Sequence, residues 1–359
     1  MKVPETLTLN GIHHTKEMLM KRIENQCFES DLLLKEVFTF LAFWLDGKPT
    51  IEVKTSGSTG TPKFLLVEKE QMLQSALLTT TYFDLKPNMN ALLCLSPAYI
   101  AGKMMIVRSM VANLNLITTN VTSYPLAAIE SKIDFAAMVP FQFIKTYSET
   151  PEKLTKISTI ILGGSGLNPA ITLAAEKITT SVFHTYGMTE TLSHIALRAV
   201  NGPEKSDWFT PFDGIDISLD YRECLMINAP MLSKKKLITN DIAILDENNC
   251  FRILGRYDDV IITAGIKIHP NMIETKIVST LRFPFAIVPV EDDKAGQLPF
   301  LVIEQTLSLS EVYDLWMQLM EHLTEQEVPR QIVSIEPFPL LESGKIDRRA
   351  ISNMLKQKF

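Results

Sequence analysis

The chain has 359 residues, of which 46% are hydrophobic and 21% charged, and its formal net charge is −6. Such a chain can bury a sizeable core, which excludes intrinsic disorder, and its acidic balance disfavours nucleic-acid binding through a global basic field. None of the four cysteines forms a CxxC pair, so we expect neither a disulfide framework nor a zinc site. No apolar stretch approaches the roughly 18 residues of a membrane span, and the N-terminus lacks a signal-peptide core, so the sequence predicts a cytoplasmic protein without a membrane span.

Apolar runs of helical and strand length alternate along the chain. A helix is expected over 31–45, because one face would carry Leu33, Val37, Phe40, Leu41 and Trp44. A second helix is expected over 68–82. Strands are expected at 51–53, 64–67, 91–95, 114–118, 135–139, 158–162 and 242–246. Helical stretches lie between several of these strands, and this alternation predicts an α/β fold with substantial parallel pairing.

The composition changes after Leu254, where the polar, turn-like segment Gly255-Arg256-Tyr257-Asp258-Asp259 begins. Beyond it we expect a helix over 308–324 and strands at 285–290, 300–304 and 331–335. The sequence therefore predicts two domains. Residues 1–257 would form a large N-terminal domain of mixed and parallel sheets with packed helices, and residues 258–359 would form a small α+β C-terminal domain.

The strongest local signal is the segment Thr55-Ser56-Gly57-Ser58-Thr59-Gly60-Thr61-Pro62-Lys63. Its glycines allow backbone N–H groups to approach an anion closely, its hydroxyls add donors and its lysine adds positive charge. The spacing is not that of a Walker A loop, and the segment joins two expected strands instead of opening a helix. Taken by itself, such a segment is also compatible with a polar hairpin loop.

The segment resembles the phosphate loop of the adenylate-forming enzymes, the family of acyl-CoA synthetases, luciferases and peptide-synthetase adenylation domains. Further motifs resemble those of the family in the same order: Gly163-Gly164-Ser165-Gly166, Tyr186-Gly187-Met188-Thr189-Glu190, Thr239-Asn240-Asp241, Gly255-Arg256-Tyr257-Asp258-Asp259 and Gly344-Lys345-Ile346-Asp347-Arg348. Asn240 stands where the family has glycine. The chain is identified as a member of this family with a shortened N-terminal region, since only 54 residues precede the phosphate loop.

The resemblance implies a role for each motif. ATP or AMP would contact Thr55, Ser56, Gly57, Ser58, Thr59, Gly60, Thr61, Lys63, Gly163, Gly164, Ser165, Tyr186, Gly187, Met188, Thr189, Asp241 and Arg256. Tyr186 would stack on adenine, and Asp241 and Arg256 would bond the ribose. The expected catalytic residues are Thr189, which would bond the α-phosphate, Glu190, which would hold Mg²⁺, and Lys345. Lys345 would stabilise the charge that develops as a carboxylate attacks the α-phosphate.

The reaction implied by the resemblance has two halves. A carboxylate and MgATP would give an acyl-adenylate and pyrophosphate, and the thiol of coenzyme A would then displace AMP. The C-terminal domain would be mobile and would pivot at Asp258 between the two halves. Rotation would withdraw Lys345 and bring Gly265 to the coenzyme A channel, where glycine leaves room for a pantetheine arm. ATP, Mg²⁺ and coenzyme A, the last as a substrate, are therefore expected.

Some details resemble the o-succinylbenzoate–CoA ligases of menaquinone biosynthesis, a branch of the family. The likeness lies in YGMTETLSH at 186–194 and in Ile268-His269-Pro270, whereas Ile100 stands where the family commonly has histidine. This acid has two carboxylates, and the one that does not react needs a cationic or hydrogen-bonding partner. The candidate acid-binding residues are Tyr99, Lys103, Arg108, Ser193 and His194. Burying Lys103 or Arg108 without an anion would be costly, but both could also extend to the surface, and His194 could be a core residue.

Two other functions stay open on the sequence. One is another acyl- or aryl-CoA synthetase, or an adenylation enzyme that loads a carrier protein. The other is a non-catalytic adenylate-binding protein, which the retained Lys345, Glu190 and phosphate loop disfavour. The expected partners are small molecules, with no nucleic acid, and the oligomeric state is open, a homodimer being one option.

Overall fold

The computed structural model describes residues 2–25, 31–54, 64–281, 283–340 and 346–356. The chain forms two compact units. Unit 1 comprises Met1–Ile217, Ile227–Leu237 and Glu247–Cys250, and unit 2 comprises Ser218–Met226, Ile238–Asp246 and Phe251–Phe359. The chain therefore passes between the units five times. No helix among the described residues is both long enough and apolar enough to cross a membrane.

Unit 1 is built on a nine-stranded sheet with the strand order β11-β10-β9-β8-β7-β5-β6-β1-β2. The neighbours from β9 to β1 are parallel, and β2, β10 and β11 are antiparallel to their neighbours. The strands are β1 (Leu7–Leu9), β2 (Ile12–His14), β5 (Asn90–Leu93), β6 (Asn115–Thr118), β7 (Ile133–Met138), β8 (Ile157–Leu162), β9 (Ser181–Gly187), β10 (His194–Ala199) and β11 (Thr210–Pro211). The predicted α/β class with parallel pairing is confirmed.

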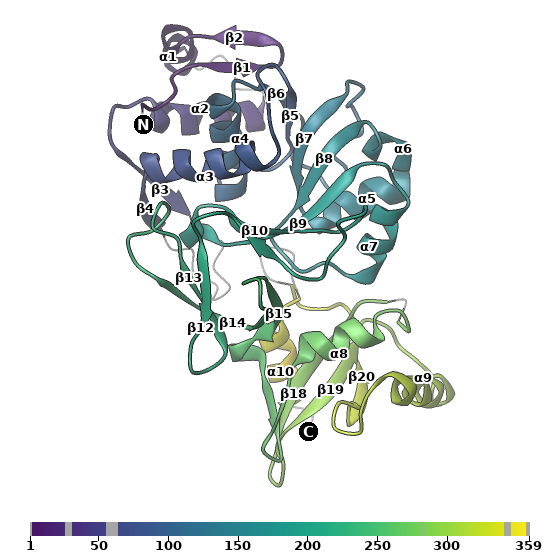
Figure 1. Cartoon of the computed structure of the whole chain (residues 1–359). Coiled ribbons are helices and arrows are strands. Elements are labelled where there is room, and N and C mark those ends of the chain that lie inside the picture. The colour runs from purple at the N-terminus through teal and green to yellow at the C-terminus, as the bar shows by residue number, and fades with distance from the viewer. Residues whose placement is uncertain (1, 26–30, 55–63, 282, 341–345, 357–359) are drawn as a thin grey trace. The chain divides into compact units, whose positions relative to one another are not determined.

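Helices cover both faces of this sheet (Figure 1). They are α1 (Lys16–Glu24), α2 (Leu32–Trp44), α3 (Lys69–Tyr82), α4 (Ile100–Val111), α5 (Pro140–Glu149), α6 (Pro151–Leu154) and α7 (Pro169–Glu176). One hydrophobic cluster joins α2, α3 and α4 to Leu93 and Phe135, and a second joins α5 and α7 to Leu92 and Ala136. Because successive strand residues point to opposite faces, the two clusters bury the two sides of one sheet.

Two elements beside the sheet follow the sequence pattern closely. The side chain of Asp31 caps α2 by accepting a hydrogen bond from the N–H of Leu34 at 3.0 Å. The helix buries the five residues expected on its apolar face: Leu33, Val37, Phe40, Leu41 and Trp44. Strands β3 (Thr50–Lys54) and β4 (Phe64–Glu68) form an antiparallel pair in which Lys54 faces Phe64. The predicted phosphate loop therefore lies between two paired strands in the sequence, as expected, but its residues lie outside the described ones.

Unit 2 contains most of a four-stranded sheet and all of a five-stranded one. The first has the order β12 (Asp216–Leu219), β13 (Cys224–Asn228), β14 (Leu237–Leu245) and β15 (Phe251–Arg256). The second consists of β17 (Ile266–Ile268), β16 (Ile261–Thr263), β19 (Gly296–Ile303) and β18 (Phe285–Asp292), with β20 (Gln331–Ser334) also paired to β19. Its helices are α8 (Pro270–Ile277), α9 (Leu309–His322) and α10 (Arg348–Lys356). The strands and the long helix predicted beyond residue 280 are all present.

One carboxylate joins three elements of unit 2. Glu274 of α8 accepts a hydrogen bond from the N–H of Ile287 on β18 at 2.7 Å. The same carboxylate forms a two-pronged ion pair with Arg348 of α10, with N–O distances of 2.5 and 2.7 Å. Arg348 also donates to the carbonyl of Ile287 at 2.9 Å. Glu274 therefore fixes the start of α10, a few residues after Lys345 in the sequence.

Candidate functional site

Two of the predicted nucleotide motifs lie at the carboxyl edge of the parallel strands in unit 1. The glycine turn Gly163–Ser165 follows β8, and Tyr186 and Gly187 end β9. Strands β8 and β9 are parallel neighbours, so the two motifs lie side by side. In open parallel sheets, ligands bind outside the carboxyl ends of the strands. The fold thus places both motifs at the edge where open parallel sheets commonly bind ligands.

The glycine turn has a backbone that demands glycine. Gly164 has a φ of +88°, which L side chains rarely adopt, and a Cβ on Gly163 would lie 2.6 Å from Thr185 Oγ1. The N–H of Gly163 donates to the carbonyl of Met138 at 3.2 Å, which ties the turn to the end of β7. The turn therefore has a fixed backbone conformation. Its two successive glycines have no Cβ atom that would keep a ligand away from the backbone.

His184 holds the glycine turn through a hydrogen bond, and the sequence analysis did not identify this residue. Its Nδ1 accepts a hydrogen bond from Arg198 Nε at 3.2 Å, so Nε2 carries the proton and donates to the carbonyl of Ser165 at 3.1 Å. Burial, together with the positive charge of Arg198, lowers the pKa of His184 to about 3. The ring is therefore neutral at physiological pH and keeps this tautomer.

Phe209 contacts the side chains next to Tyr186, the residue predicted to stack on adenine. Its ring centroid lies 5.1 Å from that of His184 and 5.9 Å from that of Tyr186, and the guanidinium of Arg198 lies 5.6 Å away over the same ring. His184 and Tyr186 are two residues apart on β9, so they share a face of the strand. That alternation was the signal that could have identified His184.

The Tyr186–Glu190 motif comprises the last two residues of β9 and the start of the tight turn that follows it. A Cβ on Gly187 would lie 2.2 Å from the carbonyl oxygen of Ser193, so only glycine fits there. The hydroxyl of Thr191 accepts from the N–H of Met188 at 2.9 Å and lies 2.7 Å from the same Ser193 oxygen. These contacts hold a short 3₁₀ turn, Thr189–Thr191, in which Thr189 is buried and Glu190 is exposed.

Glu190 has the surroundings that a magnesium ligand needs. Its carboxylate forms no hydrogen bond or ion pair with any residue that the structure describes. An exposed carboxylate without a partner among the described residues suits a hard cation that keeps several waters. The residue present therefore fits the ion that the sequence implies.

Arg108 is the most unusual of the five acid-binding candidates. It lies on α4 with 2% of its surface exposed, so it does not extend to solvent. Its Nη2 donates to Ser193 Oγ at 2.5 Å and its Nη1 lies 3.7 Å from Met105 Sδ, while Nε has no hydrogen-bond partner among the described residues. No carboxylate in the described part of the chain pairs with it, and burial lowers its pKa. A buried cation without an anion is energetically costly.

The other acid candidates have different surroundings. Lys103 donates to the carbonyls of Pro97 and Ala98 at 2.6 and 3.0 Å, so it closes the turn before α4. Burial lowers its pKa, and the carboxylate of Glu36 opposes that shift. Tyr99 is 43% exposed and lies in the same turn. His194 is buried at the start of β10, next to the half-buried Ser193.

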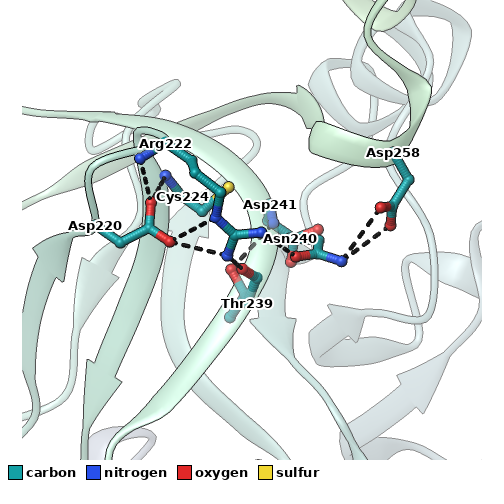
Figure 2. A network of polar contacts seen from close by, with 7 residues as sticks. All are labelled: Asp220, Arg222, Cys224, Thr239, Asn240, Asp241 and Asp258. Atoms are coloured by element: carbon teal, nitrogen blue, oxygen red, sulfur yellow. Dashed lines mark hydrogen bonds and ion pairs between the residues drawn. The ribbon is translucent and has the colours of Figure 1, made fainter.

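In unit 2 the predicted ribose residue Asp241 and the predicted hinge residue Asp258 belong to a polar network that also includes Asn240 and Arg222 (Figure 2), and Arg256 adds further contacts to it. Arg256 contacts Asp241 Oδ1 at 3.2 Å and Asp258 Oδ2 at 3.1 Å. Asn240, at the position of the family's glycine, donates through Nδ2 to both carboxylate oxygens of Asp258, at 3.3 and 3.1 Å. Its Oδ1 accepts from Arg222 Nη1 at 3.0 Å. Asn240, in place of glycine, therefore links β14 to Asp258 through hydrogen bonds.

The remaining predicted residues divide into two groups. Gly265 has a φ of +83°, and no atom lies within 4 Å of where its Cβ would be, so this exposed turn favours glycine for its conformation. The phosphate-loop residues 55–63 and Lys345 lie outside the described residues.

The doubly covered parallel sheet, the glycine turn and the Tyr186–Glu190 turn at its carboxyl edge define an adenylate-forming enzyme. The model of the family described as AMP-binding enzyme matches residues 54–215. An acyl-CoA synthetase (AMP-forming)/AMP-acid ligase II-like protein from Dyadobacter fermentans DSM 18053 is 32% identical, with 93% of this chain and 97% of that chain covered and a TM-score of 0.62. The chain belongs to the AMP-forming acyl-CoA synthetase family, and the predicted enzyme class, an AMP-forming acid–CoA ligase, is confirmed.

Two further relatives concern the acid. The 2-succinylbenzoate–CoA ligase of Lactococcus lactis subsp. lactis (strain IL1403) is 26% identical, with 97% of this chain and 84% of that enzyme covered. The o-succinylbenzoate CoA synthetase of Bacillus subtilis, solved with its acyl-adenylate intermediate, has a TM-score of 0.80 at 17% identity, over 97% of this chain and 95% of that chain. At that identity the second comparison supports the fold alone.

Proposed function

We propose that the protein joins o-succinylbenzoate to coenzyme A, in the cytoplasm, by way of an acyl-adenylate. In the first step one carboxylate oxygen of the acid attacks the α-phosphorus of ATP, and pyrophosphate leaves. In the second step the thiol sulfur of coenzyme A attacks the acyl carbon, the thiol proton is lost, and AMP leaves. The family supports the reaction type, and the likeness to the Lactococcus lactis enzyme supports the acid.

The observation that carries the choice of acid is the buried Arg108. Its Nε–H lacks an acceptor and its positive charge lacks a carboxylate among the described residues. A guanidinium binds a carboxylate through two N–H groups, so Arg108 offers a site for the carboxylate of o-succinylbenzoate that does not react. Ser193, which contacts Arg108, comes three residues after Glu190, so this cation belongs to the same edge of the sheet as the nucleotide motifs.

The nucleotide roles follow from the motifs and their surroundings. Tyr186, whose ring contacts that of Phe209, would stack on adenine, and the glycine turn would lie beside the adenine. Thr189 would bond the α-phosphate, and Asp241, held by Arg256, would bond the ribose hydroxyls. The phosphate loop and Lys345 would contact the phosphates, and Lys345 would stabilise the charge that develops at the α-phosphate.

Glu190 is the residue that would hold Mg²⁺, because its carboxylate is exposed and uncommitted among the described residues. The ion, when bound, neutralises phosphate oxygens during the attack on the α-phosphorus. We further propose that residues 258–359 act as the mobile domain, that Asp258 is its pivot and that Gly265 lines the coenzyme A channel.

The test is thioester formation by the full chain from o-succinylbenzoate, ATP, Mg²⁺ and coenzyme A, read by mass spectrometry. Benzoylpropionate, which has the same side chain and ketone but lacks the ring carboxylate, is the comparison acid. We expect kcat/KM to be about 100-fold higher for the dicarboxylate, because a buried charge pair is lost with the smaller acid. Arg108→Gln should remove most of that preference. Arg22→Gln is the matched control, since Arg22 contacts His14 and Phe38 instead.

Other outcomes would identify the alternatives. AMP formation without the thioester would indicate another acceptor, such as a carrier protein. Thioesters of other acids but not of o-succinylbenzoate would overturn the choice of acid and keep the enzyme class. ATP binding without pyrophosphate release from any acid would favour the non-catalytic protein.

A further inference from the structure

Behind Arg108 lies a chain of hydrogen bonds that runs through the interior of unit 1. Arg108 Nη2 donates to Ser193 Oγ at 2.5 Å, and Ser193 Oγ lies 3.3 Å from His194 Nδ1. His194 Nε2 lies 3.1 Å from Thr79 Oγ1, and Thr79 Oγ1 donates to the carbonyl of Ser75 at 3.3 Å. Arg108, His194 and Thr79 are 2%, 5% and 0% exposed and Ser193 is half-buried, so water competes little for these bonds.

The chemistry of the groups gives this chain a single direction. A guanidinium can only donate, so Ser193 Oγ accepts from Arg108 and its own hydrogen is free to point at His194 Nδ1. With Nδ1 accepting, a neutral imidazole carries its proton on Nε2 and donates to Thr79 Oγ1. The hydroxyl of Thr79 then donates to the carbonyl of Ser75 on the preceding turn of α3. Each of the four hydrogen bonds in the chain thus has one donor and one acceptor.

The chain requires a neutral His194, and its surroundings provide one. The ring is buried against Phe212, with centroids 5.4 Å apart. Burial and the charge of Arg108 lower the pKa of His194 well below its ordinary value. A protonated ring would present an N–H to the hydroxyl of Ser193 and would add a second buried cation beside Arg108.

We propose that Thr79, His194 and Ser193 are positioning residues, which hold Arg108 in the one orientation that binds the unreacted carboxylate of the acid. The proposal rests on the function proposed above. A long arginine side chain has many rotamers, and fixing it in advance lowers the entropy lost on binding a carboxylate. Thr79 is the far end of the chain. It would therefore affect the choice between dicarboxylate and monocarboxylate acids through three hydrogen bonds and without contacting the acid.

The test compares Thr79→Val, which keeps the shape and removes the hydroxyl, with Thr79→Ser, which keeps the hydroxyl. For Thr79→Val we expect the KM for o-succinylbenzoate to rise about tenfold, with the KM values for ATP and benzoylpropionate unchanged, because His194 Nε2 loses its acceptor along with the bond from Thr79 to the carbonyl of Ser75. Thr79→Ser should restore most of the affinity. Thr146→Val is the matched control, since Thr146 is another fully buried helical threonine whose hydroxyl donates to a carbonyl four residues earlier, at 2.8 Å.

Two further measurements separate positioning from folding. In the double variant Thr79→Val/Arg108→Gln, the KM for o-succinylbenzoate should equal that of Arg108→Gln alone, because Thr79 acts only through Arg108. Independently of activity, ¹⁵N NMR of the imidazole should show an unprotonated Nδ1 and a protonated Nε2 in His194 of the wild-type protein at neutral pH.

The outcomes distinguish this proposal from the function on which it rests. If the wild-type protein makes no o-succinylbenzoyl-CoA, both are overturned. If it does, but the effects of Thr79→Val and Arg108→Gln multiply, or Thr79→Val weakens both acids equally, only the positioning role is overturned. A protonated Nδ1 in His194 would also contradict it, since the chain would then run in the wrong direction.

Discussion

Removing the carboxylate of Glu274 should lower the free energy of unfolding of unit 2 by more than the loss of a surface ion pair would. In Glu274→Ala the two-pronged pair with Arg348 is lost, and the N–H of Ile287 loses its acceptor. The side chains of Arg348 and Glu274 are only 26% and 17% exposed, so solvent replaces these bonds poorly. Among the residues that the structure describes, Arg348 would keep one hydrogen-bond acceptor, the carbonyl of Ile287.

The size of the effect follows from this partial burial. Breaking a fully buried pair costs about 3–5 kcal/mol and an exposed one about 0–1 kcal/mol, so we expect a loss of about 3 kcal/mol here. For a unit of this size that corresponds to a melting temperature roughly 6–12 °C lower. Glu274→Gln keeps one acceptor oxygen, so about half of the loss is expected.

Differential scanning calorimetry of the whole chain measures this directly. The matched control is Glu149→Gln, which breaks the pair between Lys145 and Glu149, whose side chains are 42% and 47% exposed. That variant should lose less than about 0.5 kcal/mol. If Glu274→Ala melted within about 1 °C of the control, the reasoning from burial and geometry would be refuted.

Three more expectations concern residues of β9 and of the turn after it, at the carboxyl edge of the parallel strands in unit 1. Gly187→Ala should lower ATP–pyrophosphate exchange more than about 100-fold, because its Cβ would lie 2.2 Å from the backbone oxygen of Ser193, and a normal exchange rate would contradict this. Glu190→Gln should lower Mg²⁺-dependent adenylation about 100-fold, while the melting temperature stays that of the wild type, since the exposed carboxylate has no partner among the described residues. The folded-state pKa of His184, about 3, lies below its ordinary value of 6.5, so the folded state binds fewer protons in this range. Between pH 6.5 and about pH 3, His184 should therefore lower the free energy of unfolding by about 1.4 kcal/mol for each pH unit, and urea titrations of His184→Asn at pH 5 to 7 should show this contribution removed.

The sequence predicted most of what depends on local pattern. The α2 helix buries the five residues its spacing indicated, because a period of 3.6 brings them to one face. The parallel strands β5, β6, β7 and β8 were predicted from short apolar runs between helices, whereas β9 was not predicted. The short strands β1, β2 and β11, of which β2 and β11 form the edges of the sheet, were missed, since two or three residues carry too little periodicity to be recognised.

The site was predictable where a motif marks it and not where packing builds it. The glycines at 164 and 187 have backbone reasons to be glycine, and both were found as parts of motifs. His184 and Phe209 were missed because their role depends on contacts between strands that only the fold brings together. Thr79 lies 115 residues from His194 in the sequence, and no local pattern connects them.

The repeated passage of the chain between its two units restricts how the protein can be divided. A fragment that begins at Phe251 would keep β15 but lose β14. Residues 241–245 of β14 form the antiparallel partner of residues 251–256 of β15. The exposed edge of β15 would then invite aggregation. No single cut yields both units intact. For the same reason, a single recombination event could not have exchanged one whole unit for another, and swapping units between relatives would have to move several separate segments together.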